Sequence, residues 1–287
     1  MIAILKREFK SYLHNVSGFI FISFLLLFAG FFTAAQNLFG GSASFGYALY
    51  NVVIVFLLIV PILTMRAIAE EKHTRTDQLL YSLPISMTSV VIGKYLAMVC
   101  VFLIPMAVIC VYPILLSLFG IMHYASAYSA VLGLFLLGCA LIAICTFISS
   151  LTESQIIAAV ISFGVLLAFY LMNGLSAMIP TTALASFICM VILSALLSLL
   201  VYALTKNFNI AVIVATVCVV PLCAVYMVKA SLFSGLFPAL LSYLAVFDRF
   251  YTFVYGIFDV TAVVYYLTVI VFFLFLTVQV MEKKRWS

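Results

Sequence analysis

Long apolar runs separated by short polar breaks dominate this sequence. Eight runs reach about 20 residues, the length that a helix needs to cross the hydrocarbon layer of a membrane. They cover residues 16–35, 45–64, 90–118, 126–150, 155–175, 183–204, 210–228 and 261–281. Within each run the apolar residues are continuous and do not alternate with polar ones, which favours helices over barrel strands. The pattern predicts an all-α polytopic membrane protein with about eight transmembrane helices, folded as a single domain over 1–287.

The composition agrees with a chain that is embedded in a lipid bilayer. Of its 287 residues, 68% are hydrophobic and only 7% are charged, whereas a soluble domain has about a quarter of its residues charged. We therefore expect the lipid bilayer as a partner and no nucleic acid. All seven cysteines lie inside apolar runs, without the spacing of a metal site. The sequence predicts no metal and no cofactor bound by this chain.

The basic residues fall almost entirely on one side of the predicted membrane. With eight spans, only Lys229 and Arg249 of the thirteen Lys and Arg residues lie on the opposite side. The positive-inside rule makes the basic side cytoplasmic, so both termini are predicted to be cytoplasmic. Lys94, Glu153 and Lys229 lie at span ends, where we expect their side chains to reach water.

The loop at 65–86, after the second span, concentrates the scarce charge. Its acids and bases have helical spacing, because Arg66 and Glu70 are four apart, as are Glu71 and Arg75. Pro84 is expected to end the loop's helix, and Ser86 or Thr88 could cap the next one. Two interpretations follow from the residues alone: a solvated turn, or a docking surface for another protein.

Two further segments are amphipathic or apolar without being predicted spans. Residues 1–14 place apolar side chains at helical spacing between charged ones, which predicts an interfacial helix. It could anchor the chain to the lipid surface or contact a partner. Residues 231–259 are apolar and aromatic, and we expect short external re-entrant helices there, before the last span.

Several sequence blocks closely resemble the ABC-2 superfamily of ABC transporter permeases. They are PILTMRAIAEEK at 61–72, TDQLL at 76–80, PIS at 84–86 and GKY at 93–95. Further blocks resemble the gliding-motility (GldF-like) branch: SSLTESQI at 149–156, FDRF at 247–250, GIFD at 256–259 and YYL at 265–267. Many members of the family have six spans, so residues 183–228 would add an extra pair to a six-helix core.

The resemblance implies a role for the charged loop. In this family the loop after the second span carries a coupling helix that inserts into a separate ATP-binding subunit, which holds ATP and Mg. The chain itself is then a non-catalytic permease subunit in the bacterial cell membrane, expected to pair with a second copy or a related permease, with an accessory membrane or extracellular subunit as a further partner. The implied ATPase-coupling residues are Arg66, Glu70, Glu71, Arg75, Thr76, Asp77, Leu80 and Pro84. Other positions that match family motifs are Pro61, Met65, Gly93, Lys94, Glu153, Gln155, Asp248, Phe250, Gly256 and Asp259.

Three other functions compete with an ATP-driven exporter. An intramembrane enzyme needs convergent polar groups at membrane depth, and an ion-coupled carrier needs buried charged relays or broken-helix ion sites. No acid lies in the middle of a predicted span, and His14, His73 and His123 lie at span ends or in loops. A membrane component of a motility or envelope machine, without a transported cargo, stays open as the third alternative.

Overall fold

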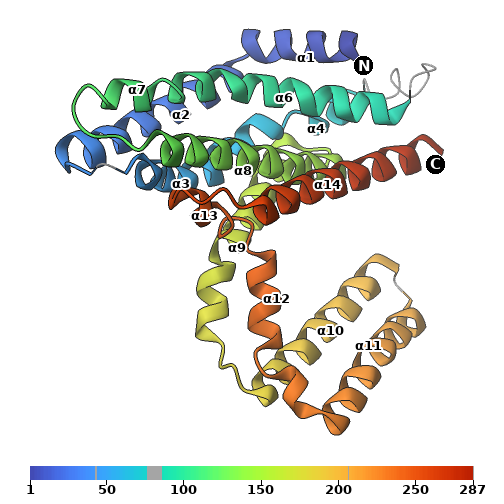
Figure 1. The fold of residues 1–287 in the computed structure, drawn as a ribbon. Coiled ribbons are helices and arrows are strands. Elements are labelled where there is room, and N and C mark those ends of the chain that lie inside the picture. The colour runs from blue at the N-terminus through green and yellow to red at the C-terminus, as the bar shows by residue number, and fades with distance from the viewer. Residues whose placement is uncertain (43, 76–85, 206, 287) are drawn as a thin grey trace. The chain divides into compact units, whose positions relative to one another are not determined.

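The computed structural model describes residues 1–42, 44–75, 86–205 and 207–286, and every regular element among them is a helix (Figure 1). The chain divides into two compact units. Unit 1 comprises Met1–Ala168 and Arg249–Ser287, and unit 2 comprises Phe169–Asp248. The predicted extra pair at 183–228 therefore falls within unit 2.

Unit 1 is built around the long helix α8 (Tyr124–Leu151). This helix packs against α3 (Phe45–Thr64), α6 (Met87–Ile109), α13 (Phe250–Val254) and α14 (Val260–Trp286). Small side chains permit this packing: a Cβ on Gly138 would lie 2.4 Å from the ring of Phe102 in α6. The other elements of the unit are α2 (Val16–Thr33), its continuation as the π-helix η1 (Ala34–Phe39), α4 (Ala69–His73), α7 (Tyr112–Leu116) and the start of α9 (Gln155–Met178).

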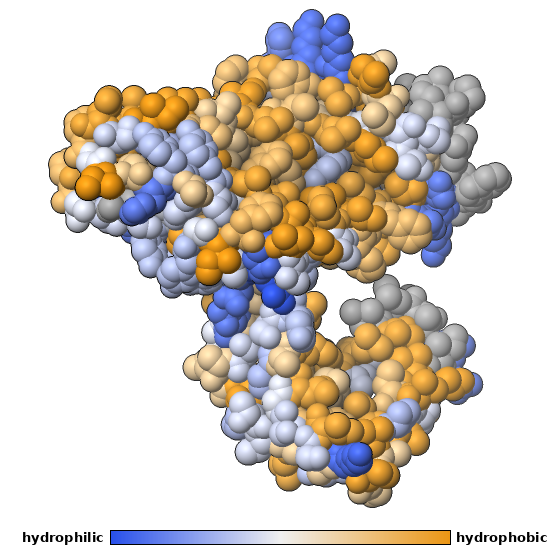
Figure 2. Space-filling view, viewed as in Figure 1, coloured by the Kyte–Doolittle hydropathy of each residue, from blue (hydrophilic) through white to orange (hydrophobic). Residues whose placement is uncertain are grey.

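The predicted interfacial segment forms the helix α1 (Ile2–His14), which packs on α6 and α2 (Figure 1). Its apolar side is partly covered by protein: Tyr12 is buried, and a Cβ on Gly93 of α6 would lie 3.3 Å from Cβ of Ile4. In Figure 2 the visible face of unit 1 is mostly hydrophobic, and hydrophilic atoms gather over α1. The segment is helical, as predicted, and the helix docks on its own chain, while its place at the membrane interface stays a prediction.

Six helices in the described part of the chain are long and apolar enough to cross a membrane. They cover Val16–Phe39, Phe45–His73, Met87–Leu116, Tyr124–Leu151, Gln155–Met178 and Val260–Lys284. These match six of the eight predicted spans, so the chain is an integral membrane protein. The other two runs are also helical, as α10 (Ala183–Thr205) and α11 (Phe208–Val228).

Unit 2 holds α10 and α11 side by side, followed by the 3-10 helix η2 (Ala230–Phe233) and α12 (Leu236–Leu244). Helix α10 is apolar over Ala183–Leu199, and the chain bends by 119° between Val212–Val228 and Ala230–Leu244. An aromatic cluster joins these helices: the rings of Phe187 and Tyr226 are stacked at 4.4 Å, and Phe233 meets both edge-on. That α10 and α11 each cross the membrane stays a prediction.

The segment predicted as re-entrant, 231–259, contains most of η2 together with α12 and α13. Its family-motif positions have structural contacts within their own units. In unit 2, Asp248 accepts a hydrogen bond from Asn173 at 2.7 Å. In unit 1, Phe250 is fully buried and the guanidinium of Arg249 lies 5.5 Å from the ring centre of Tyr265.

The start of α14 depends on two of the motif residues. Asp259 accepts a hydrogen bond from the backbone N–H of Thr261 at 2.8 Å, and the Thr261 hydrogen bonds lower the pKa of its carboxyl. Gly256 has φ of +78°, a left-handed conformation that glycine adopts without a Cβ penalty. A Cβ there would also lie 2.8 Å from the side chain of Ser126 in α8.

Candidate functional site at residues 65–75

The 65–75 segment follows α3 and contains α4. The last turn of α3 includes Pro61, whose carbonyl accepts a hydrogen bond from Met65 N at 2.8 Å. Thr64 donates its hydroxyl to the carbonyl of Val60 at 2.9 Å, so its polar group is satisfied inside the helix. The chain leaves α3 through Met65–Ile68 and turns once more as α4. This segment is where the sequence analysis placed the charged loop.

Helix α8 supplies the N-terminal cap of α4. The Oγ of Ser149 accepts hydrogen bonds from the backbone N–H groups of Ile68 at 3.3 Å and Ala69 at 3.2 Å. The same hydroxyl donates to the carbonyl of Met65 at 3.3 Å. The first N–H groups of a helix have no partner within it and need one from outside. Ser149 meets this need from a different helix, and so fixes where α4 begins.

Lys72 also binds α4 to α8. Its side chain is only 7% exposed, and its Nζ donates a hydrogen bond to the carbonyl of Ser150. A solvated loop would leave this ammonium in water. The buried side of α4 is therefore packed protein, formed by Ala69 and Lys72.

Lys94 of α6 is the second anchor, and here the sequence expectation is wrong. We expected Lys94 to reach outward to water at a span end, yet its side chain is 3% exposed. Its Nζ donates to the carbonyl of Ala67 at 2.8 Å and lies 2.8 Å from Glu71 Oε1. The carbonyl and the carboxylate replace the water that the ammonium loses, which offsets part of the cost of burying it.

Helix α1 completes a group of four charges that we call the Lys94 cluster: Arg7, Glu8, Glu71 and Lys94. Glu8 Oε1 lies 3.5 Å from Lys94 Nζ and 2.7 Å from Arg7 Nη2. Arg7 also lies 3.5 Å from Glu71. The hydrogen bond to Glu8, with the charge of Glu71, raises the pKa of Arg7. The cluster thus joins α1, α4 and α6 by charge pairs.

The outer side of the 65–75 segment carries the pair predicted from spacing. Arg66 holds Glu70 through two hydrogen bonds, Nε to Oε2 at 2.8 Å and Nη2 to Oε1 at 2.6 Å. The two side chains are 24% and 36% exposed. Arg75, at the end of the described segment, is exposed and has φ of +56°. The predicted pairing of Glu71 with Arg75 stays a prediction, and Thr76, Asp77, Leu80 and Pro84 lie outside the described residues.

The structure gathers some motif positions here and leaves others elsewhere. Met65 begins the segment and Lys94 contacts it, whereas Gly93 lies beside α1. Ser86 caps α6 as expected, accepting from Ser89 N at 3.4 Å. Glu153 is exposed in the break before Gln155 begins α9. Phe250 and Gly256 lie toward the other end of α3, since a Cβ on Gly46 would lie 2.5 Å from the Val254 carbonyl.

Four contributors were missed by sequence reasoning: Arg7, Glu8, Ser149 and Ser150. The two serines belong to the SSLTESQI block that resembles the family, and Arg7 and Glu8 are among the charged residues between the apolar positions of α1, so each position was noticeable in the sequence. Neither signal specified a contact with the 65–75 segment.

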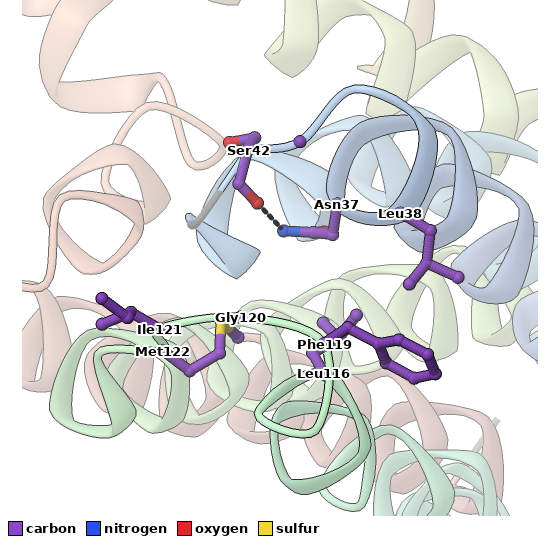
Figure 3. A pocket seen from close by; sticks show the side chains of 9 residues that line it. Asn37, Leu38, Ser42, Leu116, Phe119, Gly120, Ile121 and Met122 are labelled. Carbon is purple, nitrogen blue, oxygen red and sulfur yellow. Dashed lines mark hydrogen bonds between the residues drawn. The ribbon is translucent and has the colours of Figure 1, made fainter.

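A pocket of about 440 Å³ opens near the start of α3, at the end opposite the 65–75 segment. Its walls come from η1 and the segment after α7 (Figure 3), where Asn37 donates to the carbonyl of Ser42 at 2.7 Å. The lining residues are Asn37, Leu38, Gly41, Ser42, Leu116, Phe119, Gly120, Ile121 and Met122. None of them is ionisable, so the pocket itself provides no acid–base chemistry. The described residues also contain no group of His, Cys, Asp and Glu that could hold a metal ion.

Comparison with protein families gives one match. The family model described as ABC-2 family transporter protein matches residues 33–228. The matched range includes the 65–75 segment, Lys94 and Ser149, together with both helices of the extra pair. No curated protein and no solved structure matches the chain.

Proposed function

Because the chain belongs to the ABC-2 family of transporter proteins, we propose that it is a permease subunit driven by a separate ATP-binding subunit that docks on the 65–75 segment. The observation that carries this proposal is the two-sided construction of α4. One side is buried against α8 through Ala69 and Lys72, and the other presents the partly exposed Arg66–Glu70 pair. A short helix held in this way can receive force on one side and pass it to the spans on the other.

The anchors define where that force goes. Ser149 and Ser150 connect α4 to α8, and Lys94 connects the segment to α6. Both α8 and α6 are candidate membrane spans. A displacement of α4 by an ATP-binding subunit is thus delivered to two spans directly. ATP and Mg belong to the partner in this proposal, and the permease contributes no catalytic group.

The proposal places the permease in a bacterial cell membrane with both termini and the 65–75 segment in the cytoplasm. The one-sided distribution of Lys and Arg supports this orientation. Counting α10 and α11 as spans gives eight and keeps both termini on the same side, as six spans also would. We further propose export as the direction of transport, and a second permease copy or a related permease as the membrane partner.

Co-purification with the ATP-binding subunit that partners the permease tests the docking site. Replacing Arg66 and Glu70 together by Ala removes both charges of a partly exposed pair, which costs folding about 1 kcal/mol. We expect the variant to accumulate normally in the membrane and to lose ATPase binding. The matched control is Glu282→Gln, a half-exposed acid near the C-terminus of α14. Equal binding by the double variant and the control would contradict the proposed function.

A further inference from the structure

We propose that the adjacent acids Glu70 and Glu71 have different roles, and that Glu71 is a positioning residue acting inside the permease. In this view Glu71, Lys94 and Glu8 fix α4 against α6 and α1, whereas Glu70 faces the ATP-binding subunit. The inference rests on the proposed function, because it divides the work of the coupling loop between two neighbouring residues.

Helix geometry gives the two acids different directions. Successive residues of an α-helix are separated by about 100° around the axis. Glu70 reaches back along its own segment to Arg66, at 2.6 Å. Glu71 reaches across to Lys94 at 2.8 Å and to Arg7 at 3.5 Å, and its side chain is 16% exposed against 36% for Glu70. The more buried acid therefore makes the contacts with other helices.

The environment of Lys94 makes Glu71 hard to replace. Its side chain is 3% exposed, and its ammonium lies near the Ala67 carbonyl, Glu71 and Glu8. Removing one partner of a buried charge pair is strongly destabilising, because the remaining charge stays in a low-dielectric site. Removing both partners in favour of uncharged side chains of similar volume is much less costly. This difference in cost between removing one partner and removing both distinguishes the buried Glu71–Lys94 pair from a pair on the surface.

Helix α1 is joined to the Glu71–Lys94 pair and is expected to move with it. Glu8 contacts Lys94 at 3.5 Å, and the close approach of Ile4 to Gly93 adds an apolar contact one residue away. The three elements α1, α4 and α6 are therefore coupled through one group of atoms. We infer that they shift as one body when the ATP-binding subunit pushes on α4.

The first experiment uses the isolated permease in detergent, without any ATPase. We expect Glu71→Gln to lower the melting temperature by about 5–15 °C, and Glu70→Gln to change it by less than about 3 °C. Adding Lys94→Met to Glu71→Gln should restore at least half of the loss. An equal change in melting temperature for the two glutamine variants, or no recovery in the double variant, would overturn the positioning role of Glu71.

The second experiment measures ATPase stimulation in proteoliposomes that contain the permease and its ATP-binding subunit. For Glu70→Gln we expect a three- to tenfold higher concentration of subunit at half-maximal stimulation. For Glu71→Gln we expect unchanged half-maximal concentration and at least about a threefold lower maximal rate per folded complex. The Glu71→Asp variant, which keeps the charge, should recover most of that rate. If both variants weaken binding equally, Glu71 faces the partner and the inference fails while the proposed function stands. If neither changes binding or rate, both fail.

A cross-link tests the rigid body directly. Cysteines at positions 4 and 93, in a chain without its seven native cysteines, should form a disulfide on mild oxidation, because the Cβ atoms would lie 3.3 Å apart. We expect ATPase stimulation in the oxidised sample to match that in the reduced sample. Reversible loss of stimulation on oxidation would show that α1 slides against α6 and would overturn the inference.

Discussion

The side chain of Ser149 and the backbone of Ala69 meet at 3.2 Å, so that α8 caps the first turn of α4. A cap normally comes from the residue just before the helix, but the N-cap residue here is Ile68, which has no side-chain acceptor. The start of α4 is consequently defined by tertiary packing. Any change that shifts α8 along its axis also shifts the point at which α4 begins.

Replacing Ser149 by Ala should destabilise the permease by about 1–3 kcal/mol. The hydroxyl accepts from two buried N–H groups, and removing the acceptor leaves both unsatisfied. Thermal unfolding in detergent measures the loss. Ser176→Ala is the matched control, because that hydroxyl bonds only to a carbonyl three residues earlier and is exposed. A Ser149→Ala variant as stable as the control would contradict the capping role.

Gly138 should not tolerate even a methyl group. A Cβ there would lie 2.4 Å from the Phe102 ring, and overpacking of this kind costs about 1–3 kcal/mol. Gly164→Ala in α9 is the control, since nothing lies within 4 Å of its Cβ position. We expect Gly138→Ala to lower the melting temperature and Gly164→Ala to leave it unchanged or slightly higher. The opposite ranking would contradict the close packing of α8 on α6.

Alanine substitutions at Gly256 and Gly235 distinguish the cost of backbone strain from the cost of steric crowding. Both have positive φ, +78° and +71°, but only the Cβ position of Gly256 is crowded, by Ser126 at 2.8 Å. Alanine at either position should cost about 1–2 kcal/mol of backbone strain. We expect Gly256→Ala to be the more destabilising by about 1–3 kcal/mol, measured by thermal unfolding. Equal losses would show that the start of α14 yields to the added methyl.

Single cysteines in a chain without native cysteines test the topology. Impermeant maleimide should label positions 2 and 206 only from the cytoplasmic side, and positions 123 and 240 only from outside. Positions 2 and 123 flank candidate spans, and position 206 tests the extra pair, whereas position 240 is expected outside with or without that pair. Labelling of 206 from outside would contradict eight spans.

Continuous apolar runs made six spans predictable, because a lipid-facing helix and a buried one both require uninterrupted apolar sequence. The same rule could not decide α10 and α11. Both α10 and α11 are apolar, and the chain bends by 119° between Val212–Val228 and Ala230–Leu244, so composition alone does not give their path. Hydropathy shows that a helix fits apolar surroundings, but it does not show whether the helix crosses the membrane.

The 65–75 segment shows a similar limit at the level of side chains. The Arg66–Glu70 pair was predictable because residues four apart meet on any helix. The Glu71–Lys94 and Ser149–Ala69 contacts were not, because they join residues whose proximity depends on how α6 and α8 pack. Lys94 was wrongly expected to reach water, since a lysine at a span end has that route available in sequence and loses it only when α1 covers α6.

The formal charges of the Lys94 cluster, two positive and two negative, sum to zero. A charge displaced across a membrane at 100 mV exchanges about 2.3 kcal/mol with the electric field, whereas a neutral group exchanges none. The four charges of the cluster therefore contribute no net electrical work when the cluster changes its depth in the membrane. Any dependence of that motion on membrane voltage comes from the other charges that move with the cluster, such as Lys6 and Lys10 of α1 and Lys72 of α4.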